Sequence, residues 1–159
     1  MMTTVYGRLF AGVALMAMVL STGVAAHVSI TPRESAQGAT EKYTVRIPTE
    51  GKVATVAAEL EVPDGVIVET LQAPAGFKYE VTRKEDRIVA ITWTADVKPG
   101  EFIEVAFVAR NPRQGAQLVW TLRQRFADGT VTDWTMAPNG TVRPTAVTKL
   151  TPVAPRPAP

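Results

Sequence analysis

Leu118–Phe126, with the sequence LVWTLRQRF, is followed by Asp128-Gly129 and then by Thr130–Trp134, TVTDW. Both runs are β-rich and interleave apolar with polar residues, which is typical of a β-strand with one buried face. Asp-Gly between two such runs is a strong hairpin signal, because tight hairpin turns need residues that accept positive φ angles. The stretch therefore predicts an antiparallel pair of strands in the last third of the chain.

Similar short β-rich runs precede this hairpin, and each ends at a proline, glycine or aspartate signal. They are Tyr43–Ile47, Thr55–Val62, Val66–Leu71, Phe77–Thr82, Arg87–Trp93 and Glu101–Ala109. The charged turn Lys84–Asp86 joins two of the runs and predicts a second hairpin. Trp93 and Trp120 lie inside alternating runs and are expected in the core. No window after residue 26 predicts a helix, and strands at this spacing favour an all-β, immunoglobulin- or fibronectin-III-like β-sandwich.

The N-terminal residues have the three parts of a secretory signal peptide. Arg8 is the only charge before the apolar run Leu9–Leu20, and small residues at 24–26 provide a cleavage site. The apolar run is shorter than the about 20 residues that a membrane-spanning helix needs. We therefore expect residues 1–26 to be removed and the mature protein to be periplasmic or secreted, with no stable membrane span. Cleavage after Ala26 is expected, and cleavage after Ala25 is the alternative.

Composition limits the partners, ligands and domain organisation that are possible for the mature chain. The 159 residues include 17 Lys and Arg and 15 Asp and Glu, which are interspersed. The lack of a basic block argues against nucleic acid and anionic membranes as partners. The chain has no cysteine, so neither a disulfide nor a thiolate ligand can form. The length suits one domain with a core. We expect a sandwich domain at residues 27–140 and a proline-rich, extended tail at residues 141–159.

His27 is the only histidine of the chain and would become its first residue after cleavage behind Ala26. A terminal histidine offers its α-amino nitrogen and a ring nitrogen to one metal ion, and such nitrogen donors favour Cu(II). Met136 would be the only sulfur-containing residue left, so the soft ligands that select Cu(I) are scarce. One histidine is too few for a blue-copper centre, a copper–zinc dismutase or a two-histidine copper oxygenase.

Several stretches of the mature sequence resemble the YcnI-like proteins of bacteria. They are His27–Pro32, Glu34–Gly38, Glu41–Pro48, Val62–Val66, Pro99–Phe102, Phe107–Pro112, Asp128–Val131 and Trp134. The resemblance covers nearly all of the sequence after residue 26. It implies an exported immunoglobulin-like sandwich that binds Cu(II) through the amine and imidazole of its terminal histidine, a glutamate and a nearby tryptophan.

On this resemblance, the metal-binding residues are expected to be His27, Glu41 and Trp134. Glu34 stays open as the carboxylate ligand, because sequence spacing does not separate the two glutamates. We expect a copper chaperone or carrier without enzymatic activity, which works with other periplasmic copper-handling proteins. A copper-dependent redox enzyme and a structural or protein-binding envelope domain without metal are the alternatives.

Overall fold

The computed structural model describes residues 27–73 and 75–153, so the predicted signal peptide lies outside the described residues. The elements in chain order are β1 Ser29–Thr31, β2 Glu34–Ala36, β3 Thr40–Pro48, β4 Thr55–Glu61, β5 Ile67–Leu71, β6 Lys78–Lys84, β7 Arg87–Val97, β8 Phe102–Arg110, β9 Gln117–Val119, β10 Thr121–Phe126, β11 Val131–Asp133, the 3-10 helix η1 Pro144–Ala146 and β12 Val147–Thr151. Within these ranges, no helix is long and apolar enough to cross a membrane.

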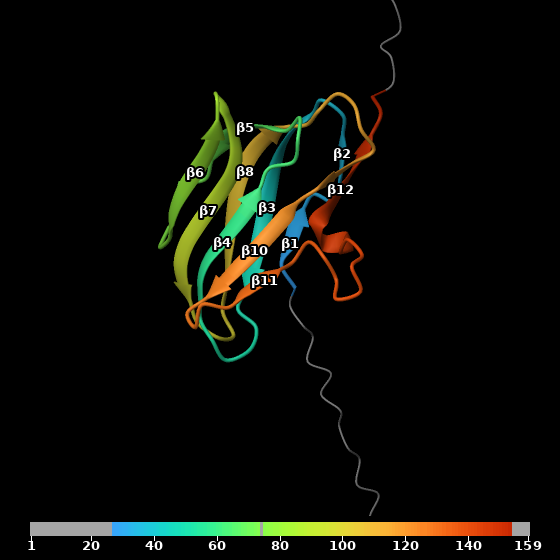
Figure 1. Ribbon diagram of the computed structural model, residues 1–159. Helices are drawn as coiled ribbons and strands as arrows, with labels where there is room; N and C mark the ends of the chain where they lie inside the picture. Colours follow the sequence, from blue (N-terminus) through green and yellow to red (C-terminus); the bar gives the residue numbers. More distant parts are fainter. Residues whose placement is uncertain (1–26, 74, 154–159) are drawn as a thin grey trace, which may run out of the picture.

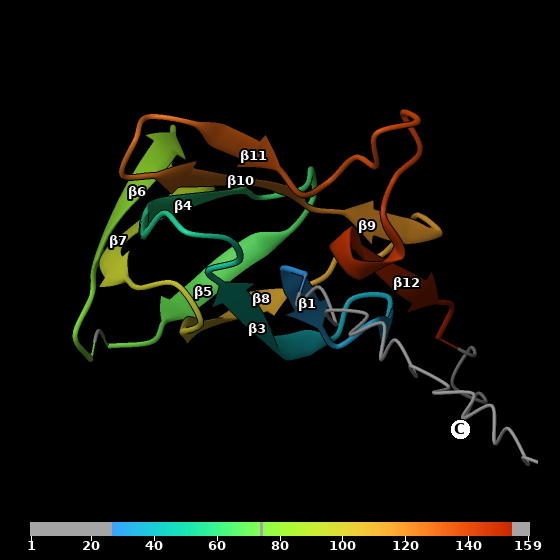
Figure 2. The ribbon, with the colours of Figure 1, turned by 90° about the horizontal axis from the view of Figure 1, so that it is seen from below.

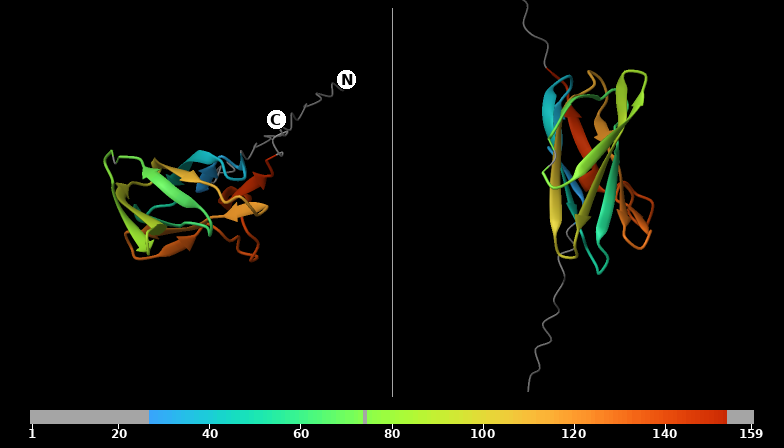
Figure 3. Two further views of the ribbon diagram at one scale, coloured as in Figure 1. Left: turned by 90° about the horizontal axis from the view of Figure 1, so that it is seen from above. Right: turned by 90° about the vertical axis from the view of Figure 1, so that its left-hand side faces the viewer.

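Two sheets pack face to face and make a β-sandwich (Figures 1 and 3). The four-stranded sheet has the order β1-β3-β8-β5, and the five-stranded sheet has the order β11-β10-β4-β7-β6. A small third sheet, β2-β12-β9, lies beside them, and only its β2–β12 pair is parallel. The predicted all-β sandwich is confirmed.

Both predicted hairpins are present. β10 and β11 pair antiparallel, and Gly129 in their turn has a φ of 85°. Asp128 Oδ1 accepts hydrogen bonds from the backbone N–H and the hydroxyl of Thr130, which fixes the turn. β6 and β7 pair across a turn at Glu85, which has a φ of 56°.

The predicted strand Leu118–Phe126 is divided into two strands that belong to different sheets. β9 pairs with β12, whereas β10 pairs with β4. The break falls at Trp120, whose Nε1–H donates to Thr148 Oγ1 at 3.1 Å. The β-rich run continues through this residue, so the sequence pattern alone does not reveal where the chain changes sheets.

The prediction of an extended tail from residue 141 is wrong for the residues up to 153. β12 pairs with both β2 and β9, and Thr148 and Leu150 are buried. Pro144 begins η1, because the first position of a helix needs no backbone N–H. The prolines favoured the prediction of a tail, whereas the segment contains a short strand whose partners lie far away in the sequence. Residues 154–159 lie outside the described residues.

The core is centred on three aromatic rings, Tyr43, Phe107 and Trp120. Their ring centroids are 4.8 to 5.7 Å apart. Trp120 and Trp93 are buried, as predicted. The hydroxyl of Tyr43 donates to Asn111 Oδ1 at 2.7 Å, so this buried phenol has a partner. Burial raises the pKa of Tyr43 to about 12, because the phenolate would lose its hydration.

The raised pKa of Tyr43 predicts a loss of stability in alkaline solution. The tyrosine ionises near pH 10 in the unfolded chain, but it holds its proton until about pH 12 in the folded protein. Between these values the unfolded state binds fewer protons, so the free energy of unfolding should fall by about 2–3 kcal/mol. Urea denaturation across this pH range measures the change. The Tyr43→Phe variant cannot ionise and should lose this part of the slope, and an unchanged slope would contradict the assignment.

Candidate metal centre

The pairing of β1 with β3 places His27 at one end of the sandwich. Ser29 lies opposite Arg46, and Thr31 lies opposite Thr44. This register, continued towards the N-terminus, brings His27 level with the last residue of β3. Figure 2 looks at this end and shows β1 near the segment that crosses from β3 to β4. His27 therefore lies at the seam between the two sheets.

Glu50 lies in the crossover from β3 to β4 and faces His27. Its Oε1 is 3.8 Å from Nδ1 of His27. This oxygen is buried and accepts no hydrogen bond. A buried polar atom without a partner costs about 1–3 kcal/mol and calls for an explanation such as an ion. The side chains of His27 and Glu50 are 38% and 33% exposed, so the pair as a whole stays open to solvent.

Thr49, the residue before this glutamate, fixes the start of the crossover. Its N–H donates to the carbonyl of Glu101 at 2.8 Å, and its own carbonyl accepts from Gly100 N–H at 3.1 Å. The Thr49 side chain is buried, and its hydroxyl bonds to that of Thr55 at 2.7 Å. The backbone is therefore held up to the residue that precedes Glu50.

Trp134, directly after β11, covers His27 from the five-stranded sheet. The two ring centroids are 5.5 Å apart, and the planes are tilted by 53°. Its Nε1–H donates to Gln124 Oε1 at 2.7 Å, so the indole offers its ring rather than its N–H to the neighbouring groups. The guanidinium of Arg143 lies 5.6 Å from the centroid of the same ring, and its Nε donates to the carbonyl of Met136. A cation beside an indole face is a favourable contact that helps to hold the ring.

The structure does not bring Glu41 to His27. Glu41 lies near the start of β3, and a rise of about 3.3 Å per residue separates it from the other end of the strand by about 23 Å. Its Oε1 accepts a hydrogen bond from Ser35 Oγ at 2.8 Å, and Ser35 Oγ in turn accepts from Asn111 Nδ2 at 2.8 Å. Glu41 thus belongs to a polar network at the opposite end. The carboxylate that lies beside His27 is that of Glu50.

Glu34 does not reach His27 either. It is exposed on β2, where its Oε1 lies 3.8 Å from Nζ of Lys149. Sequence reasoning missed Glu50 because a glutamate before a glycine, just after a strand ends, has the pattern of a solvated turn. Only the β1–β3 register could have indicated it, and that register joins segments with few distinguishing residues.

His27, Glu50 and Trp134 together form what we call the His27 cluster. In residues 27–73 and 75–153, no group of three or more His, Cys, Asp or Glu side chains is placed to hold a metal ion. The cluster therefore supplies one imidazole and one carboxylate as side-chain donors, with an aromatic ring beside them.

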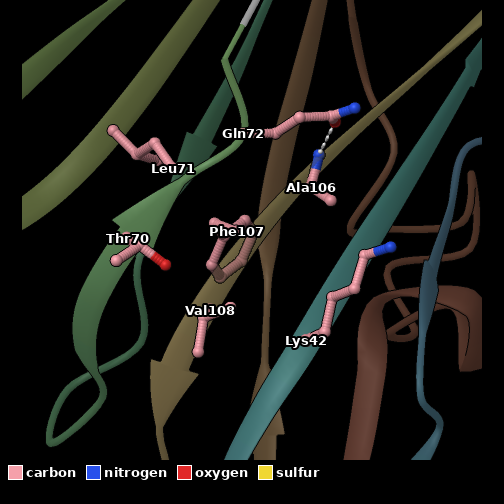
Figure 4. A pocket seen from close by; sticks show the side chains of 7 residues that line it. All are labelled: Lys42, Thr70, Leu71, Gln72, Ala106, Phe107 and Val108. Atoms are coloured by element: carbon pink, nitrogen blue, oxygen red, sulfur yellow. Dashed lines mark hydrogen bonds between the residues drawn. The ribbon is translucent and has the colours of Figure 1, made fainter.

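A cavity of about 190 Å³ is lined by residues of β3, β5 and β8 and by Gln72 (Figure 4), and no residue of the His27 cluster lines it. Lys42 is its only charged lining residue. The amide oxygen of Gln72 in its wall accepts a hydrogen bond from Ala106 N–H at 2.8 Å. Its lining therefore holds no pair of metal donors comparable to His27 and Glu50.

The fold and the site define a class, an immunoglobulin-like β-sandwich with a histidine–glutamate pair beside a tryptophan at one end. A solved structure of an uncharacterized protein from Nocardia farcinica, described as having an immunoglobulin-like fold, is similar with a TM-score of 0.64 and 28% identity. The similarity covers 80% of this chain and 99% of that one.

Residues 27–159 match the family described as Domain of unknown function (DUF1775), and the chain belongs to this family. The Copper-binding protein CutI of Bacillus subtilis (strain 168) is 34% identical over 113 residues, which make up 69% of this chain and 55% of CutI. This chain thus matches about half the length of that relative. The resemblance to the YcnI-like proteins is confirmed by these two matches.

The two glutamates should contribute differently to the stability of the metal-free protein. Glu41→Ala removes the acceptor of the buried Ser35 hydroxyl and should lower the free energy of unfolding by about 1 kcal/mol. Glu50→Gln alters a carboxylate whose buried oxygen has no hydrogen bond, so this variant should be at least as stable as the parent. Urea denaturation with a metal chelator present measures both. A Glu50→Gln variant that is less stable than Glu41→Ala would contradict these environments.

Proposed function

We propose that the protein binds Cu(II) at the His27 cluster and carries it as a chaperone in periplasmic copper homeostasis. The observation that carries this proposal is the buried Oε1 of Glu50, which accepts no hydrogen bond and lies 3.8 Å from Nδ1 of His27. With metal–nitrogen and metal–oxygen bonds of about 2.0–2.2 Å, two donors of one ion lie at most about 4 Å apart. The observed separation therefore fits one metal ion held by both atoms.

The α-amino nitrogen of His27 is the proposed third donor, and it exists only if the chain is cut after Ala26. Nδ1 is the ring nitrogen that closes a small chelate with this amine, and it is also the nitrogen that faces Glu50. The family match begins at residue 27, which agrees with a mature chain that starts there. Two nitrogens and one carboxylate oxygen form a donor set that suits Cu(II).

Copper is favoured over other metals because the relative CutI is named as a copper-binding protein. Trp134 would lie against the ion, where the ring face can make a cation–π contact and restrict access from one side. We propose a carrier rather than a catalyst, because the partly exposed His27 and Glu50 leave a bound ion open to exchange. Another copper-handling protein could then take the ion without unfolding of the sandwich.

Replacing Glu50 should alter copper binding, whereas replacing Glu41 should not. The protein that begins at His27, with one equivalent of Cu(II), should give one axial EPR species. Glu50→Gln should change this spectrum and lower the affinity roughly tenfold or more, because a carboxylate donor is lost. Glu41→Gln is the matched control and should keep the parent spectrum and affinity, since its side chain lies at the other end of β3. Competition titration with a Cu(II) chelator measures the affinities.

The opposite ranking of the two variants would overturn the choice of carboxylate. A free-copper spectrum from the unsubstituted protein would favour the envelope domain without metal. Peroxide- or reductant-driven turnover by the copper-loaded protein would favour the redox enzyme.

Extension of the mature N-terminus should weaken Cu(II) binding. One alanine placed before His27 converts the amine into a peptide N–H, so the affinity should fall roughly tenfold or more. In the unextended protein the affinity should also fall below about pH 8, because the α-amino group must lose its proton to bind. The extended protein should lack this contribution. Equal affinities of the two proteins at neutral pH would show that the amine is not a ligand.

A further inference from the structure

A buried amide lies directly behind the His27 cluster. Gln124, in the middle of β10, is fully buried. Its Oε1 accepts from Trp134 Nε1–H at 2.7 Å. Its Nε2 donates to the carbonyl of Pro48 at 2.9 Å and to Thr55 Oγ1. Both N–H groups and the oxygen of this amide are therefore used inside the sandwich.

The three partners leave only one orientation for the Gln124 amide. An indole N–H can only donate, and the carbonyl of Pro48 can only accept. The amide oxygen must therefore face Trp134, and the amide nitrogen must face the end of β3. A side chain without hydrogen-bonding groups would remove the bonds that the indole N–H of Trp134 and the carbonyl of Pro48 make with Gln124 in the interior.

These contacts connect Trp134 with the segment that carries Glu50. Pro48 is the last residue of β3 and Thr55 is the first residue of β4, so Glu50 lies between the two acceptors of Gln124. The bond between Thr49 Oγ1 and Thr55 Oγ1, 2.7 Å long, closes the network across the crossover. One amide thus holds both ends of the segment that carries the carboxylate, and it also holds the indole beside His27.

We propose that Gln124 is a positioning residue of the metal site, which fixes the Trp134 ring relative to the carboxylate of Glu50. This inference rests on the proposed function, since it assigns Gln124 to Cu(II) binding. Residues that orient metal-binding groups without touching the ion typically change affinity by 10–100-fold when they are replaced. Gln124 should act in this way through Trp134 and the crossover.

The other end of the sandwich offers a matched control. Asn111 is also a buried amide with three hydrogen bonds. Its Oδ1 accepts from the Tyr43 hydroxyl, and its Nδ2 donates to Ser35 Oγ and to the carbonyl of Ala36. Asn111→Leu and Gln124→Met therefore remove equivalent bonds from the same kind of environment, but only Gln124 contacts the His27 cluster.

The test compares these two variants in the protein that begins at His27. Cu(II) EPR and competition titration report on the site, and urea denaturation reports on stability. Fluorine NMR of 5-fluorotryptophan-labelled, metal-free protein gives one signal for each of the three tryptophans, and Trp134→Phe identifies the signal of Trp134. Gln124→Met should lower the Cu(II) affinity about tenfold, alter the EPR spectrum and shift the Trp134 signal. Asn111→Leu should lose comparable stability and leave the Cu(II) affinity, the EPR spectrum and the Trp134 signal unchanged.

Parent-like affinity, EPR spectrum and Trp134 signal in Gln124→Met would overturn the positioning role while the proposed function stands. Absence of Cu(II) binding in the unsubstituted protein would instead overturn the proposed function and this inference with it. If Gln124→Met does not fold, Thr55→Val removes one acceptor of Gln124 and leaves the Trp134 bond in place. This milder variant should change the EPR spectrum in the same direction, and an unchanged spectrum would count against the inference.

Discussion

The antiparallel register of β1 on β3 decides which side chains can meet His27. β3 runs from Thr40 to Pro48, and the register brings His27 to its C-terminal end. A carboxylate that follows β3 can therefore approach the imidazole, whereas one at its start lies about 23 Å away. Glu50 and Glu41 have the same chemistry, and the direction of one strand gives them different surroundings. Trp134, which directly follows β11 of the second sheet, lies at the same end.

Local pattern was enough to predict the fold and most of the strands. Alternation and the Asp-Gly turn predicted the hairpin of β10 and β11, and the buried positions of Trp93 and Trp120 agree with their runs. Features that depend on distant pairing were not predictable. The β-rich run continues past Trp120, where the chain changes sheets, with no signal in the sequence. The prolines near β12 gave no indication of a strand there, and β12 is stabilised by its pairing with β2 and β9. Of the candidate site, His27 and Trp134 are side by side, but the neighbouring carboxylate came from a turn that only tertiary register identifies.

At both ends of the sandwich, a buried side-chain amide provides hydrogen bonds for polar groups in the interior. At each end, one buried amide accepts from an aromatic donor and donates to a backbone carbonyl and a hydroxyl. Such networks stabilise an interior only when every member is paired, because the low dielectric that strengthens each bond also penalises each missing one. At the Asn111 end the network extends to the carboxylate of Glu41, which accepts from Ser35. At the Gln124 end it extends through the hydroxyls of Thr55 and Thr49 to the residue before Glu50, and Oε1 of Glu50 accepts no hydrogen bond from it.

This difference separates a glutamate that is hydrogen-bonded within the fold from the one that we propose as a metal ligand. The hydroxyl of Ser35 satisfies Glu41, so a metal ion would have to compete with an existing bond. The buried oxygen of Glu50 has no such bond, although the residue before it is held by backbone pairs and by a buried hydroxyl. A buried carboxylate oxygen that accepts no hydrogen bond is unfavourable for stability alone. The same arrangement would lower the cost of the proposed ion binding, because the donor would already be in place. The contrast between a hydrogen-bonded support and a carboxylate oxygen without a hydrogen bond is therefore what favours the His27 end as the proposed site.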